Sequence, residues 1–104
     1  MGRRDPLNDD QLQAVLKKLD GWKLQEGKLY REFQFADFTR AFGFMTEAAA
    51  VAEEMNHHPE WSNVWNRVKV FLWTHDAGGI TGMDVEMAER MEDIAGKLLV
   101  STSA

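Results

Sequence analysis

The stretch Glu53–Trp61 reads Glu-Glu-Met-Asn-His-His-Pro-Glu-Trp, and it decides where the longest predicted helix of the chain ends. Proline disfavours helical geometry at the residue before it, so Pro59 forces His58 to be extended and leaves His57 at or just after the last helical turn. The only other histidine, His75, follows seventeen residues after His58. All three histidines therefore lie at or just beyond the ends of regular elements, where functional groups are usually presented.

Upstream of the histidines, apolar side chains recur at helical spacing over five turns. They are Phe38, Ala41, Phe42, Met45, Ala48, Ala49, Ala52 and Met55. This pattern predicts an amphipathic helix over residues 38 to 55, with Asp37 as its N-cap. Gly43 costs such a helix about 1 kcal/mol relative to alanine, and a close approach by another element is one reason to keep a glycine there.

The first part of the chain predicts a helix followed by a hairpin. Asn8 and Gln11 stand at capping-box spacing ahead of a helix over residues 9 to 19. Residues 22–25 and 29–35 alternate apolar and polar side chains on either side of a glycine-containing turn, which is typical of a β-hairpin. Arg31 interrupts the apolar face of the second strand, so we expect an edge strand.

A second hairpin is predicted after the double histidine, with Asn66-Arg67 as its turn and residues 68 to 74 as its second strand. The aliphatic side chains of that strand should face the helices, while Phe71 and Trp73 face the other way. Exposure of these two rings would be costly, so we expect a partner on that face, most simply another copy of the chain.

Thr81 and Asp84 form a further capping box, ahead of a C-terminal helix with Met83, Met87, Met91, Ile94, Ala95 and Leu98 on its apolar face. The element order is then α-β-β-α-β-β-α. This order predicts an α+β fold, with a single antiparallel four-stranded sheet and three helices on one face.

Length and composition limit the function classes. The 104 residues fit a single domain spanning 1–104, with residues 1–7 as a loose N-terminal leader. The net charge of −5 argues against a nucleic-acid binder. The chain has no cysteine, so disulfides, thiol catalysis and zinc–thiolate sites are excluded. No apolar run reaches the roughly 18 residues of a membrane span, so no membrane partner is expected and a cytoplasmic location is the default.

The histidines indicate proton transfer, because imidazole both gives and takes protons near neutral pH. Ordinary surface or capping histidines are the plainer alternative. A metal site built from the three histidines with Glu53 or Asp76 is a further one, although neighbouring side chains such as His57 and His58 diverge in an extended chain. Glu53 lies four residues before His57 and could orient it, or could simply be a solvated carboxylate. Turn and capping chemistry explain Asp76 and Asp84 adequately.

The chain also resembles a known family at several motifs. These are Arg40 to Thr46, Asn56-His57-His58-Pro59-Glu60-Trp61, Asn63 to Val68, Thr74-His75-Asp76, and Gly79-Ile80-Thr81 with Asp84. Together they resemble pterin-4a-carbinolamine dehydratase over nearly the whole chain. Trp65 stands where that family commonly has tyrosine, and Phe71 and Trp73 are bulkier than the small polar residues of some members.

The resemblance implies a hydro-lyase that dehydrates 4a-hydroxytetrahydropterin to quinonoid dihydropterin in tetrahydrobiopterin recycling, with no metal or redox cofactor. It implies that His57, His58 and His75 line the pterin site, with His58 and His75 as the acid–base pair and His57 orienting the substrate. Glu53, Pro59, Trp61 and Asp76 would bind substrate or support these groups. The assembly would be a homo-oligomer, either a dimer or a tetramer.

The family also implies an alternative role as a protein-interaction module. Some animal members stabilise dimers of a homeodomain transcription factor, and act as a coactivator without using the histidines. In this chain such binding to a transcription-factor dimerisation domain would use the surface of the helix over residues 38 to 55.

Overall fold

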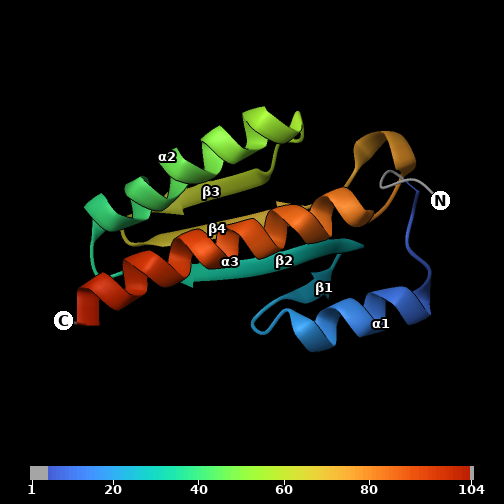
Figure 1. Cartoon of the computed structure of the whole chain (residues 1–104), viewed down its shortest axis with the longest axis horizontal. Helices are drawn as coiled ribbons and strands as arrows, with labels where there is room; N and C mark the ends of the chain where they lie inside the picture. Colours follow the sequence, from blue (N-terminus) through green and yellow to red (C-terminus); the bar gives the residue numbers. More distant parts are fainter. Residues whose placement is uncertain (1–4, 104) are drawn as a thin grey trace.

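The fold is an open sheet packed against helices. A computed structural model describes residues 5–103, with side chains up to Leu98. The elements are α1 (Asp9–Lys18), β1 (Lys23–Gln25), β2 (Lys28–Gln34), α2 (Phe38–Met55), β3 (Glu60–Val64), β4 (Arg67–Leu72), the short 3₁₀ helix η1 (His75–Ala77) and α3 (Gly82–Ser103). The four strands pair antiparallel in the order β1-β2-β4-β3 (Figure 1). The predicted α+β fold and element order are confirmed.

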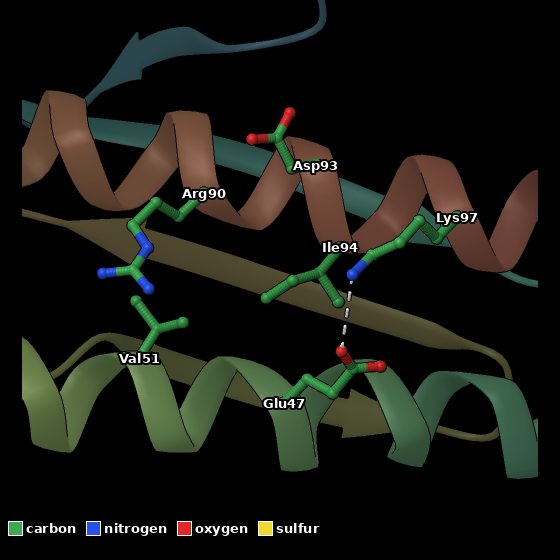
Figure 2. Close-up of a pocket in the computed structure, with 6 residues that line it drawn as sticks. All are labelled: Glu47, Val51, Arg90, Asp93, Ile94 and Lys97. Carbon is green, nitrogen blue, oxygen red and sulfur yellow. Dashed lines mark ion pairs between the residues drawn. The ribbon is translucent and has the colours of Figure 1, made fainter.

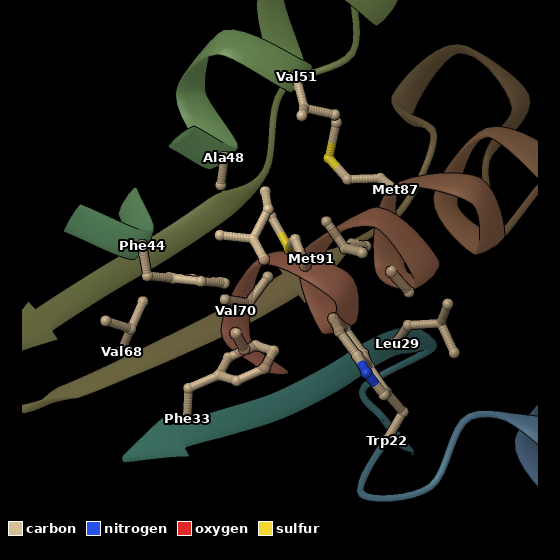
Figure 3. Packing of buried hydrophobic residues seen from close by; sticks show 14 of the residues in the cluster. Trp22, Leu29, Phe33, Phe44, Ala48, Val51, Val68, Val70, Met87 and Met91 are labelled. Carbon is tan, nitrogen blue, oxygen red and sulfur yellow. The ribbon is translucent and has the colours of Figure 1, made fainter. Parts of the chain in front are cut away.

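The core lies between one face of the sheet and the helices α2 and α3. Cross-strand partners Leu29 and Leu72, and likewise Phe33 and Val68, are buried on that face. Figure 3 shows Leu29, Phe33 and Val68 in one buried cluster with Met87 and Met91 of α3. The opposite face carries Tyr30, Glu32, Lys69 and Phe71, which are half-buried or exposed. The alternation predicted for residues 68 to 74 is therefore confirmed.

Local capping defines the helix ends. Asn8 Oδ1 accepts the N–H of Gln11, and Gln11 Oε1 accepts the N–H of Asn8, both at 2.8 Å. Asp37 Oδ1 accepts the N–H of Arg40 at 2.9 Å. At the other end of α2, Asn56 takes the left-handed conformation (φ 51°) and ends the helix three residues before Pro59. The predicted bounds of α2 and both predicted N-caps are confirmed.

The expectation that Arg31 marks an edge strand is wrong, because β2 lies between β1 and β4. The sheet accommodates the guanidinium by giving it polar partners at the edge of the core. Arg31 Nη1 donates to the carbonyl of Asp20 at 2.9 Å, and Arg31 Nε lies 3.2 Å from Glu92 Oε2. The guanidinium carbon also lies 4.5 Å from the centroid of the Phe33 ring.

The turn of the second hairpin is one residue earlier than expected. Val64 pairs with Arg67, so Trp65 and Asn66 form the turn, with Trp65 at φ 51°. The amide of Asn63 fixes this turn by donating to the carbonyls of Trp65 (3.0 Å) and Arg67 (2.8 Å). A non-glycine residue at positive φ gives little sequence signal, which explains the error.

Not all of the apolar positions predicted for α2 are in the core. Phe38 and Phe42 are exposed, and their ring centroids lie 5.7 Å apart. The buried side chains of the helix are Ala41, Phe44, Ala48, Val51 and Ala52. The apolar pattern is therefore wider than the buried stripe, and α2 presents an aromatic pair to solvent.

Gly43 does not owe its place to a close approach by another described element. Among the described residues, no heavy atom outside the helix backbone lies within 4 Å of the Cβ that a side chain would add there. Replacing Gly43 with alanine is therefore expected to stabilise the fold by about 0.5–1 kcal/mol, because alanine is the better helix former. Urea denaturation measures the change.

Gly21 provides the contrasting control for this substitution. Its φ is 89°, and a Cβ there would overlap Arg31 Nη1. Gly21→Ala is expected to destabilise the fold by more than about 1 kcal/mol. A loss of stability in Gly43→Ala would contradict the open surroundings of Gly43.

The N-terminal segment contacts the loop before α3. The N–H of Leu7 donates to the carbonyl of Ile80 at 2.8 Å, and Leu7 packs on the core. Residues 5–7 of the predicted leader therefore belong to the fold, while residues 1–4 of that leader lie outside the described residues. In the described part of the chain, no helix has the length and apolar character to cross a membrane.

Candidate active site

All three histidines line one pocket at an end of the sheet. The pocket has a volume of about 250 Å³ and is lined by Asn56, His57, His58, Trp73, Thr74, His75 and Asp76. Its two walls are the segment that follows α2 and the loop that follows β4, which lie side by side (Figure 1). Stretches seventeen residues apart in sequence are thus brought together by the antiparallel pairing of β3 with β4.

The end of α2 directs its two histidines apart. Asn56 reverses the chain, and the N–H of His57 donates to the carbonyl of Ala52 at 3.0 Å, which satisfies one of the last helical carbonyls. His57 is buried as a result, while His58 is exposed. The two neighbouring imidazoles therefore have different surroundings.

His57 is held by the carboxylate of Asp84, the third residue of α3. His57 Nε2 lies 2.5 Å from Asp84 Oδ1, and Asp84 has no exposed surface. The other carboxylate oxygen, Oδ2, accepts from Thr74 Oγ1 (2.8 Å) and from the N–H of Thr81 (2.9 Å). Asp84 therefore joins α3, the end of β4 and the double histidine in one buried network.

The directions of these hydrogen bonds define the tautomer of His57. The hydroxyl of Thr74 donates to Asp84, so at its 2.7 Å contact with Thr81 it accepts the hydroxyl proton of Thr81. Oδ2 of Asp84 therefore accepts two hydrogen bonds; taking the group as a carboxylate, which can only accept, we assign the proton of the contact at Oδ1 to Nε2 of His57. No described residue hydrogen-bonds to the Nδ1 atom of His57, so this atom remains to accept a proton or a hydrogen bond from a ligand.

His58 is the second histidine with a carboxylate partner. His58 Nε2 lies 2.6 Å from Glu53 Oε2, and both side chains are more than half exposed, at 57% and 78%. The pairing of Glu53 with His57, one of the two alternatives from the sequence, is not formed, because α2 ends at Met55 and His57 pairs with Asp84 beyond the reversal at Asn56. Glu53 instead fixes the orientation of the His58 ring.

His75 begins η1, lines the pocket and is exposed. Its ring meets the indole of Trp73 edge to face, with centroids 4.8 Å apart and an interplanar angle of 64°. Asp76 also lines the pocket and is exposed. Gly78, at φ 73°, closes the turn that carries both residues.

Three of the predicted site residues, Glu53, Pro59 and Trp61, do not line the pocket, and Glu53 is connected to it only through His58. Pro59 is half-buried and separates the histidines from β3. Trp61 pairs with Val70 on the helix-facing side of the sheet and packs against the core. Pro59 and Trp61 therefore help to position the backbone beside the pocket, and neither side chain lines the pocket itself.

Sequence reasoning missed the part that Asp84 and Thr74 take in the site. Asp84 does complete the capping geometry at Thr81, as predicted, but one carboxylate oxygen is left to bind His57. A capping residue that is also a partner of a distant histidine looks the same in sequence as an ordinary cap. Thr74 was predicted as a position on the helix-facing side of its strand and as part of the Thr74-His75-Asp76 motif, but not as a partner of Asp84.

A second hollow, of about 270 Å³, lies between α2 and α3 and contains no histidine. Figure 2 shows Arg90 and Lys97 of α3 facing α2 across Val51 and Ile94. Lys97 pairs with Glu47 at 3.9 Å, and Arg90 Nη1 donates to Glu54 at 2.9 Å. The guanidinium holds the pKa of the Glu54 carboxyl below its ordinary value. Arg90, Lys97 and Glu47 are thus engaged in ion pairs, and the hollow has no histidine to transfer a proton. The histidine pocket is therefore the candidate active site.

Metal binding finds no support in the geometry. Among the described residues, no group of three or more histidine, aspartate or glutamate side chains is arranged to hold a metal ion. His57 and His58 each direct Nε2 at a separate carboxylate, as expected for side chains that diverge.

The fold and pocket define a class of protein: a small α+β domain whose only histidines converge on one solvent-accessible pocket. The family model described as Pterin 4 alpha carbinolamine dehydratase matches residues 5–94. The chain belongs to this family, as its motifs implied.

Individual relatives agree with the family match. A protein of Solibacter usitatus whose name refers to pterin-4-alpha-carbinolamine dehydratase is 52% identical over 89 residues, covering 86% of this chain and 94% of the relative. One from Rhizorhabdus wittichii with the same name is 50% identical over 93 residues, covering 88% and 96%.

Two solved structures share the fold. A Brucella melitensis protein described as a transcriptional coactivator/pterin dehydratase superposes with a TM-score of 0.86 at 46% identity, covering 88% of this chain and all of the other. A pterin dehydratase-like protein described as a RuBisCO assembly factor in the alpha-carboxysome gives 0.60 at 22% identity, covering 72% and 87%. At this identity the second likeness concerns the fold alone.

Proposed function

We propose that the chain is a hydro-lyase that removes water from 4a-hydroxytetrahydropterin and yields quinonoid dihydropterin. The observation that carries the proposal is the convergence of His57, His58 and His75 on one pocket. Membership of the pterin dehydratase family supports the substrate class. Recycling of tetrahydrobiopterin is the pathway that this reaction would serve.

The elimination breaks the bond between C4a and its hydroxyl oxygen. One proton is delivered to the leaving hydroxyl and another is taken from a ring nitrogen, so water and the quinonoid ring form without a change of oxidation state. In our proposal the exposed imidazoles of His58 and His75 exchange these two protons. Their exposure in the lining of the pocket, and the contact of Glu53 with His58, support this role.

His57 binds and orients the substrate in this scheme. Its ring is immobilised by Asp84, and Nδ1 is the atom that accepts a hydrogen bond from the bound pterin. By holding one edge of the pterin ring, His57 favours proton exchange at the other edge, because preorganised groups lower the entropic part of the barrier. Asp76 lies beside His75 and supports that side of the pocket.

The proposed chemistry uses no metal or redox cofactor. Purified protein is expected to accelerate the decay of freshly generated 4a-hydroxytetrahydropterin, followed by absorbance, and to keep the same rate after exhaustive treatment with EDTA. A rate no higher than that of buffer would overturn the dehydratase proposal. A rate that EDTA abolishes and zinc restores would overturn the assignment of the chemistry to side chains alone.

A protein-interaction role is the second candidate function. It is supported by the exposed aromatic pair of Phe38 and Phe42 on α2 and by the coactivator description of the Brucella relative. In this proposal α2 binds the dimerisation segment of a transcription factor. Capture of such a segment that is lost in Phe42→Glu but kept in His58→Ala would support this role.

The homo-oligomer and the cytoplasmic location expected from the sequence stay predictions. Phe71 and Trp73 are half-buried within the chain, because Lys28 Nζ lies over both rings, at 5.7 and 4.8 Å from their centroids. Their exposure is therefore a weaker argument for a partner than the sequence indicated. The exposed residues of α2 and of the β3–β4 turn, Val64 and Trp65 included, offer further surface for a second copy.

A further inference from the structure

We infer that Trp73 is a specificity-determining residue, whose indole meets the substituent on C6 of the pterin and limits the size of that substituent. The inference rests on the proposed function, since it takes a 4a-hydroxytetrahydropterin as the ligand of the histidine pocket. It concerns a residue that no step of the proton exchange uses.

The position of Trp73 relative to His75 supports this inference. Both side chains line the pocket, and their ring centroids are 4.8 Å apart. In the reduced pterin, C4a, N5 and C6 are consecutive ring atoms, so a substituent on C6 leaves the ring two bonds from the reacting carbon. With His75 at the reacting edge, Trp73 is the nearest large side chain to that substituent.

The indole is held by contacts from two directions. His75 meets it from the loop after β4, and Lys28 Nζ of β2 lies 4.8 Å from its centroid. Lys28 is itself fixed by an ion pair of 3.0 Å with Glu60 of β3, so the pair spans β4 on the open face of the sheet. These cation–π and ionic contacts favour one orientation of the Trp73 indole at the pocket.

The size of the pocket fits a short substituent. Its volume of about 250 Å³ lies below the roughly 300–1,000 Å³ of sites that hold drug-sized ligands. Beyond Trp73 on the same face lie the rings of Phe71 and Tyr30, with centroids 4.7 Å apart. A small residue at position 73 would open the pocket onto this pair of rings and admit a long aromatic substituent.

The experiment compares two 4a-hydroxytetrahydropterins, one with a methyl group on C6 and one with the aminobenzoyl-glutamate substituent of folates. Wild-type protein is expected to favour the methyl compound in kcat/KM. Trp73→Ser is expected to lower this preference by about tenfold or more, mainly by lowering KM for the large compound. Lys28→Met, which releases the indole, is expected to lower the preference by a smaller factor.

Trp65→Ser is the matched control, because Trp65 is exposed at the β3–β4 turn and does not line the pocket. It should leave the preference unchanged. An unchanged preference in Trp73→Ser, with folding verified by circular dichroism, would overturn the inference, as would an equal change in Trp65→Ser.

Failure of the proposed function gives a different result. If wild-type protein accelerates neither dehydration, the proposed function is rejected. The size limit set by Trp73 is then tested by calorimetric binding of dihydrobiopterin and dihydrofolate. A higher relative affinity of Trp73→Ser for dihydrofolate supports the size limit. Equal relative affinities in wild type and Trp73→Ser overturn it.

Discussion

His58→Ala and His75→Ala are each expected to lower kcat for dehydration by about 10²–10⁴-fold, the usual contribution of a positioned group that transfers a proton. Both side chains are exposed, so their removal should change the free energy of unfolding by no more than about 0.5 kcal/mol. Stopped-flow absorbance measures the rate, and urea denaturation verifies the fold. Added imidazole should restore part of the lost rate, because solvent reaches both positions.

Glu53→Gln separates orientation from proton transfer. The amide keeps the volume of the side chain but weakens the 2.6 Å contact with His58 Nε2. Because a net hydrogen bond is worth about 0.5–1.5 kcal/mol, the expected loss of rate is roughly two- to tenfold. Full activity in His58→Ala or His75→Ala would reject that residue as one of the acid–base pair. A loss in Glu53→Gln as large as in His58→Ala would show that orientation by Glu53 accounts for the effect.

Much of the fold could be predicted from the sequence because its signals are local. The caps at Asn8 and Asp37, the proline after the double histidine and the alternation along β4 each act within a few residues. The displaced β3–β4 turn is a local error, caused by the positive φ of Trp65, while the error at Arg31 concerns long-range partners. Arg31 looked like an edge residue because its partners, Asp20 and Glu92, are set by tertiary structure.

The positions of the three site histidines could be predicted from the sequence, but their carboxylate partners could not. Sequence position alone indicated that the three histidines stand at element ends, and the fold brings them to one pocket. Their carboxylate partners depend on the direction in which the chain leaves α2. The left-handed residue Asn56 sends His57 to Asp84 and leaves His58 to Glu53, and neither pairing follows from residue spacing.

Asp84→Ala is expected to have the largest effect on stability, a loss of about 3–5 kcal/mol in the free energy of unfolding. The carboxylate is fully buried and is the acceptor for three donors: His57 Nε2, Thr74 Oγ1 and the N–H of Thr81. Its removal leaves these donors buried without an acceptor. Urea denaturation measures the loss. Asp76→Ala is the control, since Asp76 is an exposed carboxylate near the same pocket, and a change below about 0.5 kcal/mol is expected.

Asp84→Asn tests the tautomer of His57 without emptying the space. The amide oxygen can still accept from Thr74 and Thr81, but the amide nitrogen then faces His57 Nε2 and donates to it. His57 must move its proton to Nδ1, the atom that is proposed to accept from the pterin. We expect a folded protein whose KM rises at least tenfold, and ¹⁵N NMR of the imidazole should show protonation at Nε2 in wild type and at Nδ1 in the variant. Protonation of wild-type His57 at Nδ1 would contradict the assigned direction of the network, and an unchanged KM would remove His57 from substrate binding.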